Sequence, residues 1–269
     1  MSLVSYPEHE SNRAVWSEAA RRYADDTEAT LAFLRAGGTN FVAPEYDFLR
    51  PLMPCDRAIH LQCAGGRDTL SLWNLGAREV IGVDINEDMI ALARLRGEAL
   101  GASAQWIRSD VLETPEWLNG TADLVYTGRG AVCWLMDIEA WARVIARLLR
   151  PGGHFYFFDG HPVSWVWDLN AEHFQLDADY GDYFSARIYE DEGWPTSYIP
   201  EAYQQGKLAK KFERQWTVAQ LVNALITAGL ALEKLGEHPD LYWDTFPNFA
   251  PELAAKLPQT LSILARKPE

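Results

Sequence analysis

Basic residues are scarce in this sequence, and they form no cluster. The 269 residues include 24 lysines and arginines against 38 aspartates and glutamates, which gives a formal net charge of −14 at pH 7. A polyanion such as DNA or RNA would be repelled by this charge, because no run of lysine or arginine offsets it locally. We therefore expect no nucleic-acid partner, and we interpret the acidity as a contribution to solubility.

Cysteine is rare, and long apolar runs are missing. The cysteines Cys55, Cys63 and Cys133 are odd in number and have no metal-ligand spacing. The longest aromatic run, residues 155–158, is far too short to span a membrane. The first ten residues are polar and acidic, unlike a signal peptide. We expect a cytoplasmic, reduced protein that binds no metal and no membrane.

Residues 57–84 carry the clearest signal for ligand binding. An apolar run that ends at Cys63 is typical of a buried parallel strand, and Gly65 and Gly66 separate it from a segment with helical spacing. A second apolar strand ends at Asp84, 18 residues after Gly66 and close to the expected ~20 residues. In a doubly wound sheet, such glycines let the backbone approach an adenosine-containing cofactor, and the acid accepts both ribose hydroxyls. The pattern predicts a nucleoside cofactor.

Strands and helices alternate from residue 57 onward, which predicts a parallel sheet with helices on both faces. The expected fold is α/β, with a doubly wound, mostly parallel, seven-stranded Rossmann-like sheet. A helical extension precedes the sheet, and an aromatic insertion follows the fifth strand. The expected strands span residues 58–63, 80–83, 104–109, 123–127, 154–158, 230–237 and 260–265. The expected helices span residues 11–25, 27–36, 68–75, 86–100, 137–149 and 217–228, with Ser11, Asp68 and Asn86 as caps and a further short helix within 40–54.

The alternation stops between Gly160 and Arg214, where aromatic residues gather among many acids. This segment is too aromatic for a disordered linker, so we expect an ordered lid over the carboxyl edge of the sheet. The expected domains are an N-terminal extension (1–54), a cofactor-binding core (55–160 and 215–269) and a substrate lid (161–214). The aromatic residues are Trp165, Trp167, Phe174, Tyr180, Tyr183, Phe184, Tyr189, Trp194, Tyr198 and Tyr203.

Four short motifs resemble those of the class I S-adenosylmethionine-dependent methyltransferases. Residues 59–66 (IHLQCAGG) are similar to the family's first motif, L-D-L-G-C-G-x-G, and residues 83–85 match its acidic second strand. Residues 108–111 match the third-strand site, and residues 149–153 match the phrase before the fifth strand. The resemblance covers roughly residues 58–267, within a subgroup of small and mostly uncharacterised members. It implies S-adenosylmethionine as the cofactor.

The resemblance also implies which residues contact the cofactor. Asp84 would accept the ribose hydroxyls, and Asp110 would accept the adenine amino group beside the backbone N–H of Val111. Ile85 and Met89 would form apolar walls, although Met89 also suits a core position. Carbonyls at the end of the fourth strand would face the ammonium and sulfonium. The predicted set is Cys63, Ala64, Gly65, Gly66, Asp84, Ile85, Met89, Asp110, Val111, Tyr126, Thr127 and Gly128.

Three residues depart from the family's first motif: Gln62 and Ala64 replace glycines, and His60 replaces an acid. Ala64 adds a methyl group where the methionine part of the cofactor would pass. These departures leave open a catalytically silent module that binds S-adenosylmethionine or has a regulatory role. An NAD-dependent oxidoreductase is a further alternative, but it would need G-x-G-x-x-G where this chain has AGGRDT at 64–69.

The predicted activity is methyl transfer to an oxygen or nitrogen of a small-molecule acceptor. His161 follows the fifth strand and is a candidate general base, because imidazole titrates near neutrality. The alternative is that His161 belongs to a structural turn. Aromatic faces with nearby carboxylates would suit a cationic or amine substrate. The predicted substrate-binding residues are His161, Trp165, Tyr183, Trp216 and His238. The sequence leaves the acceptor and the oligomeric state open.

Overall fold

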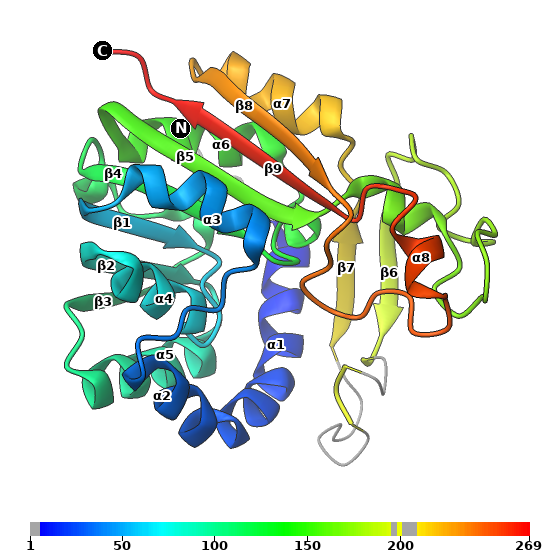
Figure 1. Cartoon of the computed structure of the whole chain (residues 1–269), viewed down its shortest axis with the longest axis horizontal. Coiled ribbons are helices and arrows are strands. Elements are labelled where there is room, and N and C mark those ends of the chain that lie inside the picture. Colours follow the sequence, from blue (N-terminus) through cyan, green and yellow to red (C-terminus); the bar gives the residue numbers. More distant parts are fainter. Residues whose placement is uncertain (1–5, 195–197, 201–208) are drawn as a thin grey trace.

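A seven-stranded sheet forms the centre of the molecule (Figure 1). The computed structural model describes residues 6–194, 198–200 and 209–269, so Tyr203 lies outside the described residues. The strand order is β3-β2-β1-β4-β5-β9-β8. The first five strands in this order pair in parallel, and β9 is antiparallel to both β5 and β8. This confirms the expected sheet. The strands are β1 (Cys55–Leu61), β2 (Ala77–Asp84), β3 (Ala104–Arg108), β4 (Ala122–Gly128), β5 (Leu149–Gly160), β8 (Ala231–His238) and β9 (Thr260–Arg266).

Helices cover both faces of the sheet, and alternate residues of the central strands supply two cores. On β5, Phe155 and Phe157 pack in one cluster with α6 and α7, whereas Tyr156 and Phe158 pack in another with α3 and α4. Such burial on both faces explains why the strand reads as one apolar run. The helices are α1 (Pro7–Asp25), α2 (Thr27–Arg35), α3 (Ala43–Leu49), α4 (Arg67–Leu75), α5 (Glu87–Leu100), α6 (Ile138–Leu148), α7 (Val218–Thr227) and α8 (Pro251–Ala254).

Two predicted helix caps were wrong. Helix α1 begins at Pro7, because proline is tolerated in the first turn, and the Ser11 hydroxyl instead donates to Lys210 O at 2.7 Å. Helix α4 begins at Arg67 after Gly66, and Asp68 instead accepts a hydrogen bond from Asn40 at 2.6 Å. The cap predicted for α5 is confirmed, because the Asn86 side chain accepts from the Met89 N–H.

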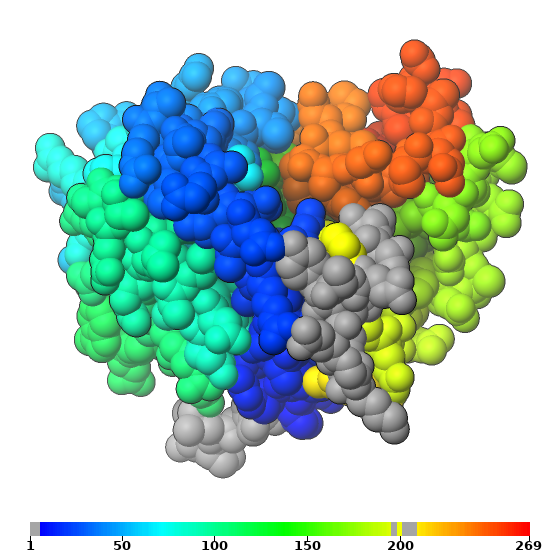
Figure 2. All heavy atoms as spheres, turned by 90° about the horizontal axis from the view of Figure 1, so that it is seen from below, coloured from blue at the N-terminus to red at the C-terminus, as the bar shows by residue number. Residues whose placement is uncertain are grey.

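The insertion contains a separate two-stranded antiparallel sheet, formed by β6 (Ile188–Glu192) and β7 (Lys210–Arg214). This hairpin lies beyond the carboxyl ends of the parallel strands, next to α1 (Figure 1). The Asn12 side chain joins α1 to β7, because its amide donates to Phe212 O at 2.8 Å and accepts from Phe212 N at 2.7 Å. Figure 2 shows the blue N-terminal helices between the green core residues and the yellow to lime insertion.

Candidate functional site

The loop after β1 keeps the shape of a glycine turn although two of its glycines are replaced. Gln62, Ala64 and Gly66 have φ of 58°, 43° and 78°. A left-handed backbone is uncommon for residues other than glycine and costs on the order of 1 kcal/mol each. The substitutions in the first motif therefore fall at positions where glycine would be unstrained.

Asp84 ties this loop to the tip of β2. Its Oδ2 accepts from the N–H of Ala64 at 2.8 Å, and its Oδ1 accepts from the N–H of Asn86 at 2.9 Å. Burial raises the pKa of Asp84 to about 6, against the effect of these backbone donors. Each carboxylate oxygen can accept a second hydrogen bond. The predicted ribose acid is thus oriented by the backbone and retains acceptor capacity.

The packing of neighbouring protein atoms leaves no room for a Cβ at the glycines of the predicted site. A Cβ on Gly66 would lie 2.6 Å from the Trp106 ring, and one on Gly65 would lie 2.8 Å from the Arg96 guanidinium. At Gly128 a Cβ would lie 1.9 Å from Phe158 O. The close packing of α5 and β3 under the loop, and of β5 beside β4, therefore gives these glycines a role within the fold.

Asp110, the predicted adenine acid, is held by the N-terminal helix. Its Oδ2 lies 2.7 Å from His9 Nδ1, and its Oδ1 accepts from the Leu112 N–H at 2.9 Å. His9 Nε2 accepts from the Met136 N–H at 3.1 Å, so the ring proton is on Nδ1. Sequence reasoning gave His9 less weight than His161 and His238, because its partner lies 101 residues away.

Asp159, at the carboxyl end of β5, holds the loop that follows β4. Its carboxylate accepts from the N–H groups of Gly130, Ala131 and Val132 at 2.6, 3.0 and 3.3 Å. It also accepts from the Tyr242 hydroxyl at 3.1 Å, and burial raises its pKa. Sequence reasoning missed Asp159, although an acid at the end of a central strand was an available signal.

Gln62 bridges the loops after β1 and β4. Its side-chain N–H donates to Ala131 O at 2.7 Å. Its Oε1 is buried without a hydrogen-bond partner among the described residues. A buried acceptor without a donor is destabilising, so this oxygen is a candidate contact for a ligand that carries hydrogen-bond donors.

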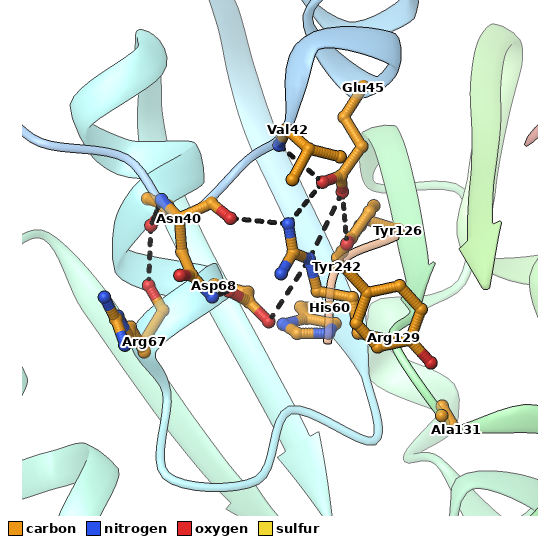
Figure 3. A network of polar contacts seen from close by, with 12 residues as sticks. Asn40, Val42, Glu45, His60, Arg67, Asp68, Tyr126, Arg129, Ala131 and Tyr242 are labelled. Atoms are coloured by element: carbon orange, nitrogen blue, oxygen red, sulfur yellow. Dashed lines mark hydrogen bonds and ion pairs between the residues drawn. The ribbon is translucent and has the colours of Figure 1, made fainter. Parts of the chain in front are cut away.

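A polar network behind these loops fixes their position (Figure 3). The Arg129 guanidinium pairs with the fully buried Glu45, and its Nε lies 4.0 Å from Asp68 Oδ2. The Tyr126 hydroxyl donates to Glu45 Oε1 at 3.0 Å. Burial raises the pKa of Glu45, and Arg129 opposes this shift. The network joins α3, the start of α4 and the loop after β4, so their positions are coupled.

The remaining predicted cofactor residues are mostly buried. The Thr127 hydroxyl donates to Leu61 O at 3.0 Å, and burial raises the pKa of the Cys63 thiol. Met89 is 1% exposed and packs with Ala64 and with residues of α1 and the insertion. The N-terminal helix thus covers this side of the loop. Val111 is buried and Ile85 is partly exposed.

His161 has both ring nitrogens engaged. Its Nδ1 accepts from the Val163 N–H at 3.1 Å, and its Nε2 lies 2.9 Å from Glu237 Oε1. Burial lowers the pKa of His161, against the effect of Glu237. This is the geometry of the structural turn that the sequence left open. A role as base would require His161 to give up one of these hydrogen bonds.

The structure does not bring all the predicted substrate residues together. Trp216 packs in the core with α6 and α7 and donates to Leu135 O at 3.0 Å, whereas His238 packs against Phe48 on the other face of the sheet. Trp216 and His238 therefore lie on opposite faces of the sheet. Tyr183 accepts from the Val218 N–H, and Trp165 contacts the Tyr180 ring.

Within the described residues, no cluster of three or more histidines, cysteines or acids is placed to hold a metal ion. No described helix combines the length and the apolar character that a membrane span requires.

Comparisons with known proteins agree with the sheet and the loop. A family model described as a methyltransferase domain matches residues 58–153. A ubiquinone biosynthesis O-methyltransferase of Hahella chejuensis (strain KCTC 2396) is 27% identical over 134 residues. That match covers 48% of this chain and 56% of the relative, so this chain spans about half of the relative's length.

Solved structures show the same architecture over most of the chain. An S-adenosylmethionine-dependent methyltransferase from Mesorhizobium loti has a TM-score of 0.58 and 26% identity, and the match covers 84% of this chain and 98% of that one. The geranyl diphosphate C-methyltransferase of Streptomyces coelicolor A3(2) has a TM-score of 0.56 at 14% identity, with coverage of 84% and 79%. The second likeness concerns the fold alone.

The polar groups at the carboxyl ends of β1, β2 and β4 fit an S-adenosyl cofactor. Asp84 retains acceptor capacity for hydroxyls, and the Oε1 of Gln62, which has no partner among the described residues, suits an ammonium group. The matched domain, the strand order and this donor and acceptor set lead to one conclusion. The chain contains a methyltransferase domain and shares the fold of S-adenosylmethionine-dependent methyltransferases, with S-adenosylmethionine as the cofactor.

Proposed function

We propose that the protein transfers the methyl group of S-adenosylmethionine to an oxygen or nitrogen of a small-molecule acceptor. The observation that carries this proposal is the coupling of Asp84 to the loop after β1, beside the loop that Asp159 holds after β4. The bound cofactor supplies a methyl group already activated by its sulfonium. The protein then contributes mainly orientation, which can lower the barrier substantially.

In this proposal the cofactor lies along the carboxyl ends of β1 to β4. Asp84 accepts the ribose hydroxyls, and Asp110 with the Val111 N–H binds adenine beside Ile85 and Met89. The backbone of residues 63–66, the carbonyls of 126–128 and the side chain of Gln62 surround the methionine part. His9 stabilises Asp110 in place through its 2.7 Å contact.

The insertion supplies the acceptor side of the site. It leaves β5 at the carboxyl edge, where open α/β sheets bind their ligands. Its ring faces suit an apolar acceptor with one polar group, and the net charge of −14 argues against nucleic acid as acceptor. His161 remains a candidate base on condition that one of its two hydrogen bonds opens.

Calorimetry with S-adenosylmethionine and S-adenosylhomocysteine tests the cofactor site. We expect Asp84→Ala to weaken binding by at least about tenfold, or ~1.4 kcal/mol, because charge-assisted hydrogen bonds are lost. Asp84→Asn keeps the acceptor for Asn86 and separates a folding effect from a binding effect. Asp56→Ala, an exposed acid on β1, is the control. Equal affinity of the wild type and both Asp84 variants would remove Asp84 from the site.

A silent cofactor-binding module is the competing function, since Gln62 and Ala64 alter the first motif. Release of S-adenosylhomocysteine during incubation with a cell metabolite extract separates the two functions. Turnover supports the enzyme, whereas tight cofactor binding without any turnover supports the module. Tight binding of NADH would contradict both.

A further inference from the structure

Glu213, in strand β7 of the insertion, carries a carboxylate that forms no salt bridge among the described residues. Among the described residues, its side chain has one contact of hydrogen-bond type, with Cys133 Sγ at 4.0 Å from Oε1. The same thiol lies 3.4 Å from Gly130 O, and its single proton serves only one acceptor. Lys211, two residues earlier, instead pairs with Asp191 at 3.2 Å. Glu213 therefore retains its capacity to accept hydrogen bonds.

Aromatic rings border this carboxylate. Tyr189 is the residue opposite Glu213 in the register of the hairpin, so the two side chains share a face of the small sheet. Tyr189 is 3% exposed and stacks on Tyr180 with ring centroids 4.2 Å apart. Burial raises the pKa of Glu213; the charge of Lys211 opposes this shift, and the charge of Asp191 adds to it. The carboxyl is thus withdrawn from water beside two stacked phenol rings.

The position of Glu213 relates it to the proposed methyl donor. Its neighbour Cys133 belongs to the short helix η4 (Val132–Trp134), which directly continues the loop held by Asp159. In that loop, Ala131 O accepts from Gln62, the residue proposed to contact the methionine part of the cofactor. Strand β7 packs directly against η4. Glu213 therefore lies on the insertion side of the place where the methyl group would be transferred.

We propose that Glu213 is the acceptor-binding base of the enzyme and that the acceptor is an amine carried on an aromatic or other apolar group. This inference rests on the proposed function. A carboxylate removed from water is costly unless a cation pairs with it, and an ammonium group provides that charge. The stacked rings of Tyr180 and Tyr189 favour both the cation and its apolar body.

The chemical step balances with this single base. The bound ammonium passes one proton to the Glu213 carboxylate, which frees the nitrogen lone pair. The nitrogen attacks the methyl carbon, and the bond between carbon and sulfur breaks with its electron pair on sulfur. The products are S-adenosylhomocysteine and a methylated ammonium, and the proton on Glu213 returns to water when the site opens. No metal, oxidant or second base enters this sequence.

Three probes with one carbon skeleton test the inference: phenethylamine, 2-phenylethanol and phenylacetate. Calorimetry on protein loaded with S-adenosylhomocysteine should show the amine binding at least about tenfold more tightly than the alcohol, with the acid weakest. Glu213→Gln should remove the preference for the amine and leave the affinity for S-adenosylhomocysteine unchanged. Glu190→Gln, the same change on the opposite face of the hairpin, should leave both unchanged.

The outcomes separate this inference from the function on which it rests. Absence of S-adenosylhomocysteine binding by the wild type would contradict the proposed function. If the wild type binds the cofactor normally, three results would overturn this inference and leave the proposed function intact. These are affinity for the alcohol or the acid equal to that for the amine, no binding of any probe, or an unchanged preference for the amine in Glu213→Gln.

Glu213→Asp shows whether the effect belongs to the charge or to the fold, because it retains the carboxylate on a shorter side chain. We expect it to restore most of the preference for the amine. Methylation of phenethylamine by the wild type should also decline toward acidic pH, as Glu213 becomes protonated, and this limb of the profile should be absent in Glu213→Gln. An Asp variant that behaves like the Gln variant would show that the carboxylate charge is not the cause.

Discussion

Gln62 combines a strained backbone with an incompletely satisfied side chain. Its φ of 58° is one that glycine adopts without cost, and its amide oxygen is buried without a partner among the described residues. Two unfavourable features at one residue are typical of functional sites. The bridge from Gln62 to Ala131 directs the amide toward the space between the loops after β1 and β4, where the methionine part of the cofactor is proposed to lie.

Binding of a full and a truncated ligand tests whether Gln62 contacts the amino-acid part of the cofactor. We expect Gln62→Leu to weaken binding of S-adenosylhomocysteine about tenfold, because a hydrogen bond to a charged ammonium is lost. Binding of 5′-methylthioadenosine, which lacks the amino-acid part, should be unchanged. Gln105→Leu, in an exposed position of β3, is the control. Equal losses for both ligands in calorimetry would show that Gln62 acts only by holding the loop.

In the proposed site, the raised pKa of Asp84 should make cofactor affinity depend on pH. Ribose hydroxyls would donate to the ionised carboxylate, so binding would favour that form and release a proton when Asp84 starts protonated. Since its pKa is about 6 in the free protein, affinity for S-adenosylhomocysteine should rise between pH 5 and pH 7 and then level off. Calorimetry across this pH range, in buffers of different ionisation enthalpy, measures the number of protons released on binding. An affinity that does not change with pH, as expected for Asp84→Asn, would contradict the proposed contact of Asp84 with the ribose.

At the scale of elements, sequence patterns predicted the helix and strand boundaries that neighbouring residues determine. The helix that starts after Asn86 and the strand that ends at Asp84 depend on residues within one turn, and both were predicted. Asp159 holds N–H groups 27 to 29 residues away, and His9 meets Asp110 across 101 residues. Such contacts form only after the sheet has brought distant loops together, and no local pattern encodes them. The start of β5 was missed for the same reason, because its first residues pair with β4.

Removal of the link between α1 and the insertion should measurably lower the free energy of unfolding. Asn12 is 3% exposed and makes two hydrogen bonds with the backbone of Phe212. We expect Asn12→Ala to lower the free energy of unfolding by about 2 kcal/mol, because both backbone groups lose their partner in a partly buried place. Ser11→Ala removes one exposed hydrogen bond and should cost about 0.5 kcal/mol or less. Urea unfolding that gives equal losses would show that Asn12 is not a link.

At the scale of the whole molecule, α1 covers the proposed cofactor side. It packs on Met89, holds Asp110 through His9 and joins the insertion through Asn12. We therefore expect entry of the cofactor to require movement of α1 or of the insertion, while the sheet beneath stays intact. Replacement of the insertion by a short linker should accordingly weaken cofactor binding as well as abolish methyl transfer.

Hydrogen exchange tests this arrangement. Amides of α1 should exchange faster than those of β4 and β5, because α1 opens locally whereas the central strands exchange by global unfolding. Addition of S-adenosylhomocysteine should slow the amides of α1 more than those of α7, which lies away from the proposed cofactor contacts. Protection that rises equally in both helices would indicate general stabilisation by the ligand and would contradict a specific closure of α1.

The contacts of α1 also set an order of events during synthesis of the chain. Asn12 and its partner Phe212 are separated by 200 residues, which a ribosome adds in roughly 10–40 s at about 5–20 residues per second. Throughout that interval the apolar side of the helix, with Val15 and Ala19, has no hairpin to pack against. Helix α1 is therefore synthesised long before the hairpin on which part of its apolar side packs, and that side is a natural target for a chaperone until the insertion arrives.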